Sequence, residues 1–339
     1  MSNDSEVTRF QLAPKENRRI FERRIVPQLL APARPQAAPV AVFLLGQPGA
    51  GKTRVSALLA QRLDERGGFA DIDSDLYKPY HPKYAQFMRE DDRKMTLYTG
   101  EDGRAWMHQA QQYARDHRLN VLVQEIAMDP EYLAQGINQY REAGHRVEVV
   151  AMGVHQALSD QGILNRYQEQ VNDRGQGRLT VPEKAAASYT GIVASAEKTE
   201  REKFADYEAI YRRDEHEPRY SNELGPSGEW QREPRFPQAI EETRNLPLTA
   251  RETLDFLQVQ SKLRVQMDPG FRPQLSTIDA QAAPLLDPDT VEIFTLRQHS
   301  ALAFPTSAEE ATRQHRETGG VAPLAQPDRG PQHGQGLEG

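Results

Sequence analysis

The sequence contains no cysteine among its 339 residues. Disulfide bonds and thiolate metal sites are therefore excluded. The absence of cysteine is compatible with a protein that works in a reducing compartment. No apolar stretch approaches the ~20 residues that a membrane-spanning helix needs. The first residues, MSNDSEVTRF, lack the charged-then-apolar pattern of a secretion signal. We therefore expect a cytoplasmic protein that acts on intracellular substrates and does not engage a membrane.

The sequence also lacks a sustained basic segment. The net charge is −7, and no block of basic residues is sustained along the chain. A nucleic-acid-binding surface needs such a block, so we expect no nucleic-acid partner. Residues 15–30 carry several arginines on a predicted helix, where a solvated helix face is the expected explanation. These arginines are Arg18, Arg19, Arg23 and Arg24.

What the chain does contain is a phosphate-binding loop. Residues 40–45, VAVFLL, have the composition of a strand buried on both faces. Apolar residues recur at helical spacing from Val55 onward, so a helix follows the loop. A chance glycine-rich turn would rarely have both neighbours, and we predict a nucleoside triphosphate site. The residues that match the P-loop pattern are Gly46, Gln47, Pro48, Gly49, Ala50, Gly51, Lys52 and Thr53.

The chemistry of this loop assigns individual roles. Its glycines allow a tight turn that aims successive N–H groups at one point. The N-terminus of the following helix favours a phosphate there. We expect Lys52 to reach the β- and γ-phosphates of ATP and the Thr53 hydroxyl to bind Mg²⁺.

Strands and helices alternate along the rest of the chain. This alternation predicts an α/β fold, a P-loop kinase-like parallel sheet with helices on both faces. In such sheets ligands bind at the carboxyl ends of the strands. Beyond the first strand we predict a short strand after the turn at 67–68, strands at 120–125, 145–154 and 207–211, and helices at 82–118, 130–143 and 157–213, the last interrupted at 172–178.

The predicted organisation has three parts. Residues 1–39 form an N-terminal helix, kinked at Pro27, and a proline-rich linker. Residues 40–265 form the kinase domain, which includes a helical lid, a polar loop over 213–237 and a helix over 249–263 with Thr249 as its N-cap. Residues 266–339 form a largely disordered C-terminal extension, with one short docking element at 290–304.

Acidic side chains are expected beside the phosphates. Asp73 and Asp75 are two residues apart, so along a strand they point to the same side. In phosphoryl transfer one carboxylate accepts the proton of the acceptor hydroxyl, and Asp75 is placed for that role. The alternative is a solvated acidic turn, which we prefer for Asp71.

Glu125 and three arginines complete the candidate site. Glu125 follows the apolar run 121–123 and resembles the Mg²⁺-binding acidic residue of a Walker B strand, although strand ends also carry charge for solubility. Arg166 and Arg178 flank the interrupted helical region, where a lid would bring guanidinium groups onto the transferring phosphate. Such an arginine contributes roughly 10³-fold or more in rate. Arg174 fits an exposed helix position equally well.

Taken in order, these segments resemble the zeta toxin family of P-loop kinases over about residues 15–215. The resemblance rests on FLLGQPGAGKT, on IDSDLYK followed by HPKY, on the VLVQE strand, and on Arg166-Tyr167 followed by RLTVPE from Arg178. It implies a toxin that uses ATP and Mg²⁺ to phosphorylate the 3′-hydroxyl of the amino sugar in UDP-N-acetylglucosamine. It also implies that Asp75 is the base, that Asp73, Asp75 and Glu125 bind substrate, and that Thr53 and Glu125 hold the metal. An antitoxin protein, or a segment of the same chain, would inhibit it.

Two departures from the family pattern concern the acceptor. After Glu125 the family commonly has a G-T-x-R segment, whereas this chain has residues 126–129, IAMD. A carboxylate that the family places one helix earlier corresponds to Gln109. Two alternatives therefore stay open. One is a kinase of another nucleotide-like or antibiotic hydroxyl, and the other is a nucleotide-dependent switch or binding module.

Overall fold

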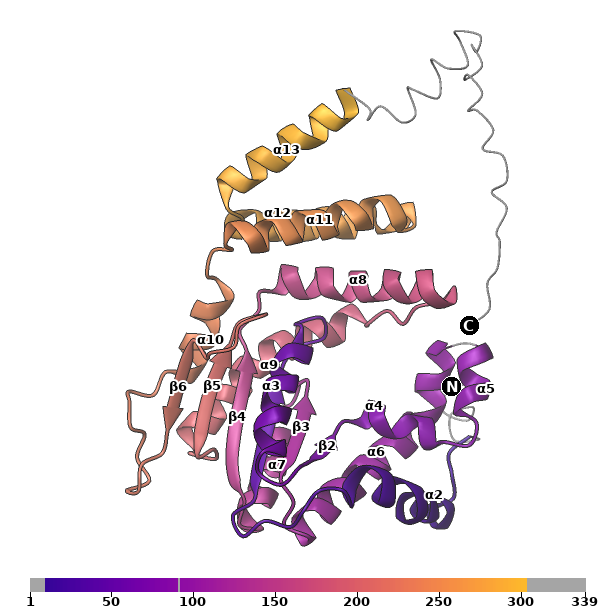
Figure 1. The fold of residues 1–339 in the computed structure, drawn as a ribbon, viewed down its shortest axis with the longest axis vertical. Helices are drawn as coiled ribbons and strands as arrows, with labels where there is room; N and C mark the ends of the chain where they lie inside the picture. The colour runs from indigo at the N-terminus through magenta and orange to yellow at the C-terminus, as the bar shows by residue number, and fades with distance from the viewer. Residues whose placement is uncertain (1–9, 91, 304–339) are drawn as a thin grey trace, which may run out of the picture. The chain divides into compact units, whose positions relative to one another are not determined.

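The computed structural model describes residues 10–90 and 92–303, and a six-stranded sheet forms its centre (Figure 1). The strand order is β2-β3-β1-β4-β5-β6, and every pairing is parallel except that of β5 with β6. The predicted α/β class with a mostly parallel sheet is confirmed. The strands are β1 (Val40–Leu45), β2 (Ala70–Ile72), β3 (Val121–Glu125), β4 (Arg146–Met152), β5 (Tyr207–Tyr211) and β6 (Tyr220–Glu223).

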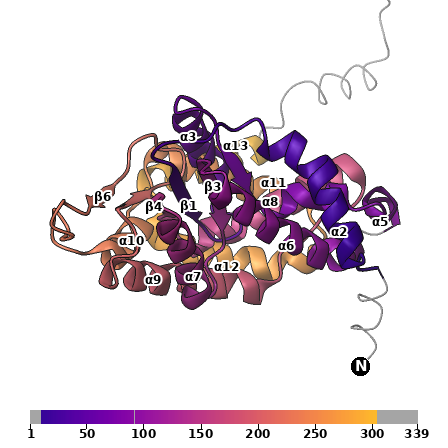
Figure 2. The same ribbon diagram turned by 90° about the horizontal axis from the view of Figure 1, so that it is seen from below.

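Helices cover both faces of this sheet. On one face α3 (Lys52–Asp64) packs its apolar stripe of Val55, Leu59 and Leu63 against alternate residues of β1. On the other face lie α6, α7, α9 and α10, so that Figure 2 shows the sheet between α3 and this second layer. All six residues of β1 are buried, as its uninterrupted apolar run predicted. The helices of the second layer are α6 (Asp92–Asp116), α7 (Pro130–Glu142), α9 (Pro182–Arg201) and α10 (Phe236–Arg244).

The predicted N-terminal helix is present, with an unusual second half. α2 (Pro14–Ile20) continues into η1 (Phe21–Leu30), which is π-helical and contains Pro27. Proline has no N–H to donate, and the helix around it takes the wider turn. Asn17 ties this segment to α6, because its Nδ2 donates to Asp102 Oδ1 at 2.8 Å and its carbonyl accepts from the indole of Trp106 at 2.8 Å.

The prediction that Asp73 and Asp75 share one side of a strand is wrong. β2 ends at Ile72, and Asp73 is the N-cap of α4 (Ser74–Tyr77). The Asp73 carboxylate accepts a hydrogen bond from the Asp75 backbone N–H at 2.9 Å. A short aspartate side chain commonly accepts a hydrogen bond from a backbone N–H two residues later. Because that N–H is then unavailable for strand pairing, the strand ends before Asp73. Asp75 therefore lies in the first turn of a short helix.

The predicted polar loop over 213–237 is also wrong in part, because it contains β6 and the start of α10. β6 has the sequence YSNE and no apolar alternation. Its pairing is supported by a polar side chain instead. Asn222 donates to the Arg232 carbonyl at 3.1 Å and accepts from the Arg232 N–H at 3.0 Å. These two hydrogen bonds of Asn222 hold the edge strand β6 in place, although β6 has no hydrophobic pattern.

Three further helices form a separate apolar cluster. They meet through side chains such as Leu164, Phe256 and Leu275. The predicted N-cap Thr249 is confirmed, and it forms a reciprocal capping box with Glu252. The third of these helices falls within the segment expected to be a largely disordered extension. The helices are α8 (Gln156–Arg174), α11 (Ala250–Gln266) and α12 (Arg272–Ala282).

The chain divides into two compact units at residue 287. The described part of the second unit is α13 (Pro288–Ala303), which covers most of the expected docking element; residue 304 and the segment 318–339 lie outside the described residues. The division into parts at 39 and 265 stays a proposal. The remaining short elements are η2 (Lys78–Tyr80), α5 (Tyr84–Glu90), η3 (Pro269–Phe271) and η4 (Ala283–Leu285).

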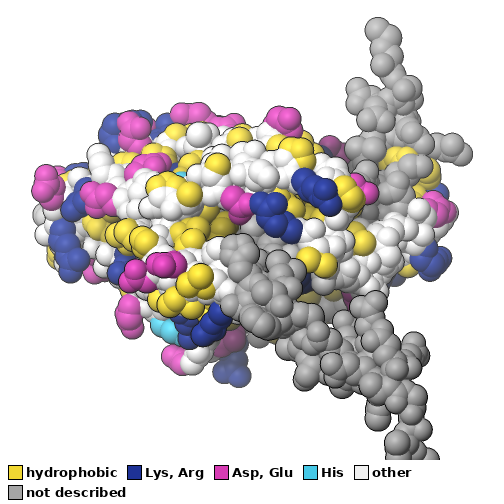
Figure 3. All heavy atoms as spheres, turned by 90° about the horizontal axis from the view of Figure 1, so that it is seen from above, with side chains coloured by type: hydrophobic (Ala, Val, Ile, Leu, Met, Phe, Trp, Pro, Cys, Tyr) yellow, Lys and Arg dark blue, Asp and Glu magenta, His cyan; other side chains and the backbone are white. Residues whose placement is uncertain are grey.

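Two surface properties of the described residues bear on partners. No helix among them combines the length and the apolar character that crossing a membrane requires. On the face drawn in Figure 3, Lys and Arg side chains are interspersed with Asp and Glu.

Candidate active site

The P-loop connects β1 to α3 at the carboxyl edge of the sheet. The Gly46 N–H donates to the Glu125 carbonyl at 3.1 Å, which joins the loop to the end of β3. Gly49 and Gly51 both have φ of 78°. A Cβ at Gly49 would lie 2.0 Å from the Ser159 carbonyl oxygen, so only glycine fits there.

The same loop packs against α8, the helix that begins the predicted lid. Gln47 is buried, and its Nε2 donates to the Val154 carbonyl and to Ser159 Oγ, both at 2.8 Å. A Cβ at Gly162 would lie 2.4 Å from the Gly49 carbonyl oxygen. Two glycines thus let the backbone of α8 approach the backbone of the loop. Gln47 has a structural role in this arrangement, in addition to its predicted place in the nucleotide site.

The loop has the free donors that a triphosphate requires. Among the residues described, the N–H groups of Gly49 and Gly51 have no acceptor. Lys52 Nζ donates to the Gly46 carbonyl at 2.5 Å. Burial lowers the pKa of Lys52 to about 8, although Asp73, Glu125 and Asp75 oppose the shift. Bound phosphate would supply the negative charge that a buried ammonium lacks.

Two carboxylates face this lysine. Burial raises the pKa of Glu125 to about 7; nearby Asp73 adds to the shift and Lys52 opposes it. Burial also raises the pKa of Asp73, whose interactions include both Lys52 and Asp75. Lys52, Asp73 and Glu125 therefore lie together at the ends of three adjacent strands, as the position of ligand sites in parallel sheets predicts.

Asp75 stands at the open side of this group, with 59% of its side chain exposed. It forms an ion pair with Lys78, one turn further along the chain. Arg178 Nη1 lies 3.7 Å from the same carboxylate oxygen. Burial tends to raise the pKa of Asp75, but Lys78, Arg178 and Arg166 together hold it below its usual value. Lys78 was not among the predicted site residues.

The lid brings two of the three candidate arginines to this carboxylate. Arg166 is on α8, and its Nη2 donates to Thr180 Oγ1 at 3.1 Å, across the loop that joins α8 to α9. Burial and the charge of Arg178 lower the pKa of Arg166. Arg174 instead pairs with its neighbour Asp173 at 3.3 Å on the exposed end of α8.

Sequence reasoning missed Arg213, which follows β5. Its Nη2 donates to the Gly49 carbonyl at 2.5 Å and to the Leu158 carbonyl at 3.1 Å, and its Nε donates to the Ala50 carbonyl at 3.4 Å. One guanidinium thus joins the P-loop to the first turn of α8. It directly follows Arg212 in a polar segment, and no pattern distinguished it.

The predicted metal ligands are Thr53 and Glu125. Among the described residues, no group of three or more His, Asp or Glu side chains is arranged to hold a metal ion by itself. A P-loop metal site has few protein ligands and completes its coordination with phosphate oxygens and water. Thr53 directly follows Lys52, and Glu125 lies close to Lys52. The Thr53 hydroxyl and the Glu125 carboxylate therefore fit an Mg²⁺ ion that is held jointly with a nucleotide.

The two departures from the family pattern have structural roles here. In the segment 126–129, Ser188 Oγ donates to the Ile126 carbonyl, and Asp129 caps α7 by accepting from the Glu131 N–H at 2.9 Å. Gln109 donates to Asn17 Oδ1 at 2.8 Å, which connects α6 to the N-terminal helix. Neither segment supplies a charged group to the acceptor side.

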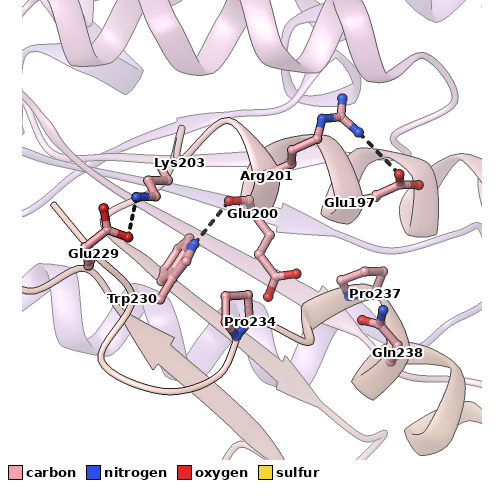
Figure 4. A pocket seen from close by; sticks show the side chains of 9 residues that line it. All are labelled: Glu197, Glu200, Arg201, Lys203, Glu229, Trp230, Pro234, Pro237 and Gln238. Atoms are coloured by element: carbon pink, nitrogen blue, oxygen red, sulfur yellow. Dashed lines mark hydrogen bonds and ion pairs between the residues drawn. The ribbon is translucent and has the colours of Figure 1, made fainter.

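A separate hollow at the end of α9 contains no free catalytic group (Figure 4). Its charged side chains pair with one another, as Lys203 does with Glu229 at 2.6 Å. The Trp230 indole donates to the Glu200 carbonyl at 3.1 Å, and the Glu200 carboxylate accepts from the Phe236 N–H at 2.7 Å. This hollow therefore has a structural explanation.

Comparisons with known proteins identify a family and a similar fold. The family model described as Zeta toxin matches residues 28–224, which is more than half of the chain. A structure of the PezAT chromosomal toxin–antitoxin system of Streptococcus pneumoniae superposes with a TM-score of 0.62 at 19% identity, covering 75% of this chain and 96% of that one. No curated protein sequence matches.

Two other solved structures are less similar. AvrRxo1-ORF1 with AvrRxo1-ORF2 and sulphate ions has a TM-score of 0.44 at 15% identity, over 80% of this chain and 86% of that one. The structure of the same pair with ATP has the same values.

Proposed function

Because the chain belongs to the zeta toxin family, whose members are generally phosphotransferases, we propose that it is a kinase using ATP and Mg²⁺. The proposed reaction transfers the γ-phosphate of ATP to a hydroxyl of a small molecule. The first candidate acceptor is the 3′-hydroxyl of the amino sugar in UDP-N-acetylglucosamine. The observation that supports this proposal best is the convergence of Lys52, Asp73, Glu125 and Asp75 with two lid arginines.

The residues of the P-loop would bind the nucleotide. The free N–H groups of Gly49 and Gly51 would donate to phosphate oxygens, and Lys52 would exchange its carbonyl partner for them. Thr53 and Glu125 would hold Mg²⁺, which neutralises charge between the β- and γ-phosphates when it is bound.

Asp75 would act as the general base. Lys78 and Arg178 keep its carboxylate ionised, so it can accept the proton of the attacking hydroxyl. The oxygen then forms a bond to the γ-phosphorus as the bond to the departing ADP breaks, and the proton stays on Asp75. Arg166 and Arg178 would neutralise charge on the transferring group.

The competing proposal is the same reaction on a different acceptor. It is favoured by the segment 126–129, which lacks the arginine of the family pattern and is used to cap α7. We also propose an antitoxin partner, because the most similar of these solved structures comes from a toxin–antitoxin system. Expression of the intact chain alone should then slow growth, and normal growth with soluble active protein would argue for a metabolic or resistance kinase.

The test is to incubate the protein with ATP, Mg²⁺ and a small-metabolite extract, and to identify by mass spectrometry which compound gains a phosphate. We expect a single class of phosphorylated hydroxyl compound, with UDP-N-acetylglucosamine as the first mass to examine. Asp75→Asn should keep ATP binding and lose transfer by roughly 10²–10⁴-fold. Transfer by Asp75→Asn at the wild-type rate would refute the base assignment.

A further inference from the structure

The segment that carries Asp75 has little helical structure of its own. Asp75 lies in α4, which is four residues long, and η2 adds three more before the chain reaches His81. Helices this short are not stable by themselves in water, so contacts outside the segment hold it in place. At its start the Tyr77 hydroxyl donates to the Asp71 carbonyl at 2.9 Å. At its end the His81 N–H donates to the Lys78 carbonyl at 3.0 Å.

His81 is held through both of its ring nitrogens. Its side chain is buried, and Nδ1 accepts a hydrogen bond from the Lys83 N–H at 3.2 Å. Because Nδ1 is the acceptor, the ring proton lies on Nε2. Nε2 is 3.2 Å from the Phe10 carbonyl oxygen and 3.6 Å from Asp102 Oδ2. Burial lowers the pKa of His81 although Asp102 opposes the shift, so the ring stays neutral at neutral pH.

A short stretch at the start of the described chain packs beside His81. It consists of residues 10–12, which we call the N-terminal strap. The Phe10 ring lies 5.0 Å from the ring of Phe87 on α5 and 4.6 Å from the ring of Tyr98 on α6. Lys83 Nζ is 4.8 Å from the centre of the Phe10 ring, which is close enough for a cation–π interaction. Phe10 is therefore the side chain that anchors the strap.

Asp102 on α6 joins the strap to His81. Its side chain is buried, and Oδ2 accepts from the Leu12 N–H at 3.1 Å, while Oδ1 accepts from Asn17 Nδ2 at 2.8 Å. A buried carboxylate needs such donors, because burial without them costs free energy. Without the strap, Asp102 would lose one donor and His81 would lose the carbonyl that faces its Nε2. The end of η2 would then be held less firmly against α6.

The same turn places the side chain that binds Asp75. Lys78 is the first residue of η2, and its carbonyl is the acceptor for the His81 N–H. Its ammonium is buried and forms the ion pair with the Asp75 carboxylate. A displacement of the turn at His81 would therefore move Lys78, and with it the carboxylate.

We propose that His81 and the N-terminal strap are positioning elements for Asp75. The strap holds His81 against α6, and His81 fixes the turn from which Lys78 holds the carboxylate. The inference rests on the proposed kinase function and extends it to the residues that place its base. The P-loop is held instead by α8 and Arg213, so ATP binding should not depend on the strap.

The first test removes the anchor of the strap in the full-length protein. With the acceptor found in the metabolite screen, we expect Phe10→Ala to lower kcat about tenfold or more, because a small displacement of a catalytic group has large effects on rate. KM for ATP should stay constant. Gln11→Ala is the matched control, because the Gln11 side chain is exposed next to Phe10, and it should match the wild type. An unchanged kcat in Phe10→Ala would overturn the proposal.

The second test uses His81→Asn, which separates the local turn from the strap. The asparagine side chain can still accept from the Lys83 N–H two residues later, but it is too short to reach the Phe10 carbonyl. We expect kcat to fall as in Phe10→Ala. The double variant Phe10→Ala/His81→Asn should lose no more than either single variant, because both act through the same contacts. Losses that multiply in the double variant would contradict a shared role.

Hydrogen exchange separates failure of this inference from failure of the proposed function, because it needs neither ATP nor acceptor. We expect the N–H groups of Asp75 and His81 to exchange roughly tenfold faster in Phe10→Ala than in the wild type or in Gln11→Ala. Amides of β1 should keep their exchange rates. If no metabolite is phosphorylated, the proposed function fails while exchange still shows whether the strap holds the turn. Equal exchange at both amides in Phe10→Ala and the wild type would refute the inference.

Discussion

The two sides of the candidate active site differ in how tightly the surrounding structure holds them. On the phosphate side, Gln47 and Arg213 bind carbonyl groups of the P-loop and α8, and glycines allow close backbone contact. On the acceptor side, 59% of the Asp75 side chain is exposed, and its carboxylate is held by ion pairs with Lys78 and Arg178. The phosphate side is built to hold one kind of ligand. The acceptor side is open enough for substitutions to change which hydroxyl is phosphorylated.

The largest effect is expected on the phosphate side. Lys52→Ala removes the ammonium that would bind the β- and γ-phosphates, and we expect phosphoryl transfer to fall by at least about 10³-fold. Transfer is measured with labelled ATP at saturating acceptor. Circular dichroism should show an intact fold, because the Gly46 carbonyl is the only hydrogen-bond partner of the Lys52 side chain among the described residues. Residual activity within tenfold of the wild type would mean that the P-loop side of the site does not bind the triphosphate.

A smaller effect on ATP binding is expected from Arg213, which also lies on the phosphate side of the site. Arg213 reaches its three carbonyls from two nitrogens, Nε and Nη2, and the single nitrogen of a lysine cannot reproduce this fork. We therefore expect Arg213→Lys to raise KM for ATP roughly tenfold and to leave KM for the acceptor constant. Arg212→Lys is the matched control, because Arg212 binds the carbonyls of Leu246 and Pro247 instead of the P-loop. If both substitutions changed KM for ATP equally, the contacts of Arg213 with the P-loop would not explain the change.

The smallest effect on catalysis is expected from Glu208, which belongs to neither side. Burial raises the pKa of Glu208 to about 9, and the nearby Glu200 adds to the shift. The folded state therefore retains a proton that the unfolded state loses near pH 4.5. The free energy of unfolding should decline between about pH 5 and pH 9, by at most ~1.4 kcal/mol per pH unit. Denaturant titrations measure this decline.

Glu208→Gln should flatten that pH dependence and leave transfer kinetics at neutral pH unchanged. The glutamine keeps an uncharged group in the same place, so the folded state no longer needs to retain a proton. An unaltered slope of stability against pH would contradict the assignment to Glu208. A loss of transfer would show that the β5–β6 edge is connected to the active site.

The sequence predicted the parts of the fold that have strong local patterns. The apolar run of β1, the P-loop and the N-cap at Thr249 were each identified. The position of Asp75 was not, because Asp73 captures its N–H and ends the strand. β6 has no apolar alternation, and it forms through pairing with β5 and the hydrogen bonds of Asn222.

The candidate site shows the same division. Lys52, Glu125 and Arg166 were found from motif and order, and they do come together. Arg213 escaped notice because its role arises only from tertiary contacts. Lys78 escaped notice because its pair with Asp75 requires a helical turn that was not predicted there. In the sequence alone, a lysine three residues after an aspartate, or an arginine in a polar segment, does not indicate a functional residue.

The contact between Gly49 and Gly162 has a mechanical consequence. If α8 tilts about this point, the displacement of each residue grows with its distance along the helix. Arg166 is four residues away, or about 6 Å, so a tilt of roughly 10° moves it by only about 1 Å. Arg174 is twelve residues away and moves about three times as far. In such a tilt Arg166 would stay almost fixed, whereas the loop that carries Arg178 would move furthest.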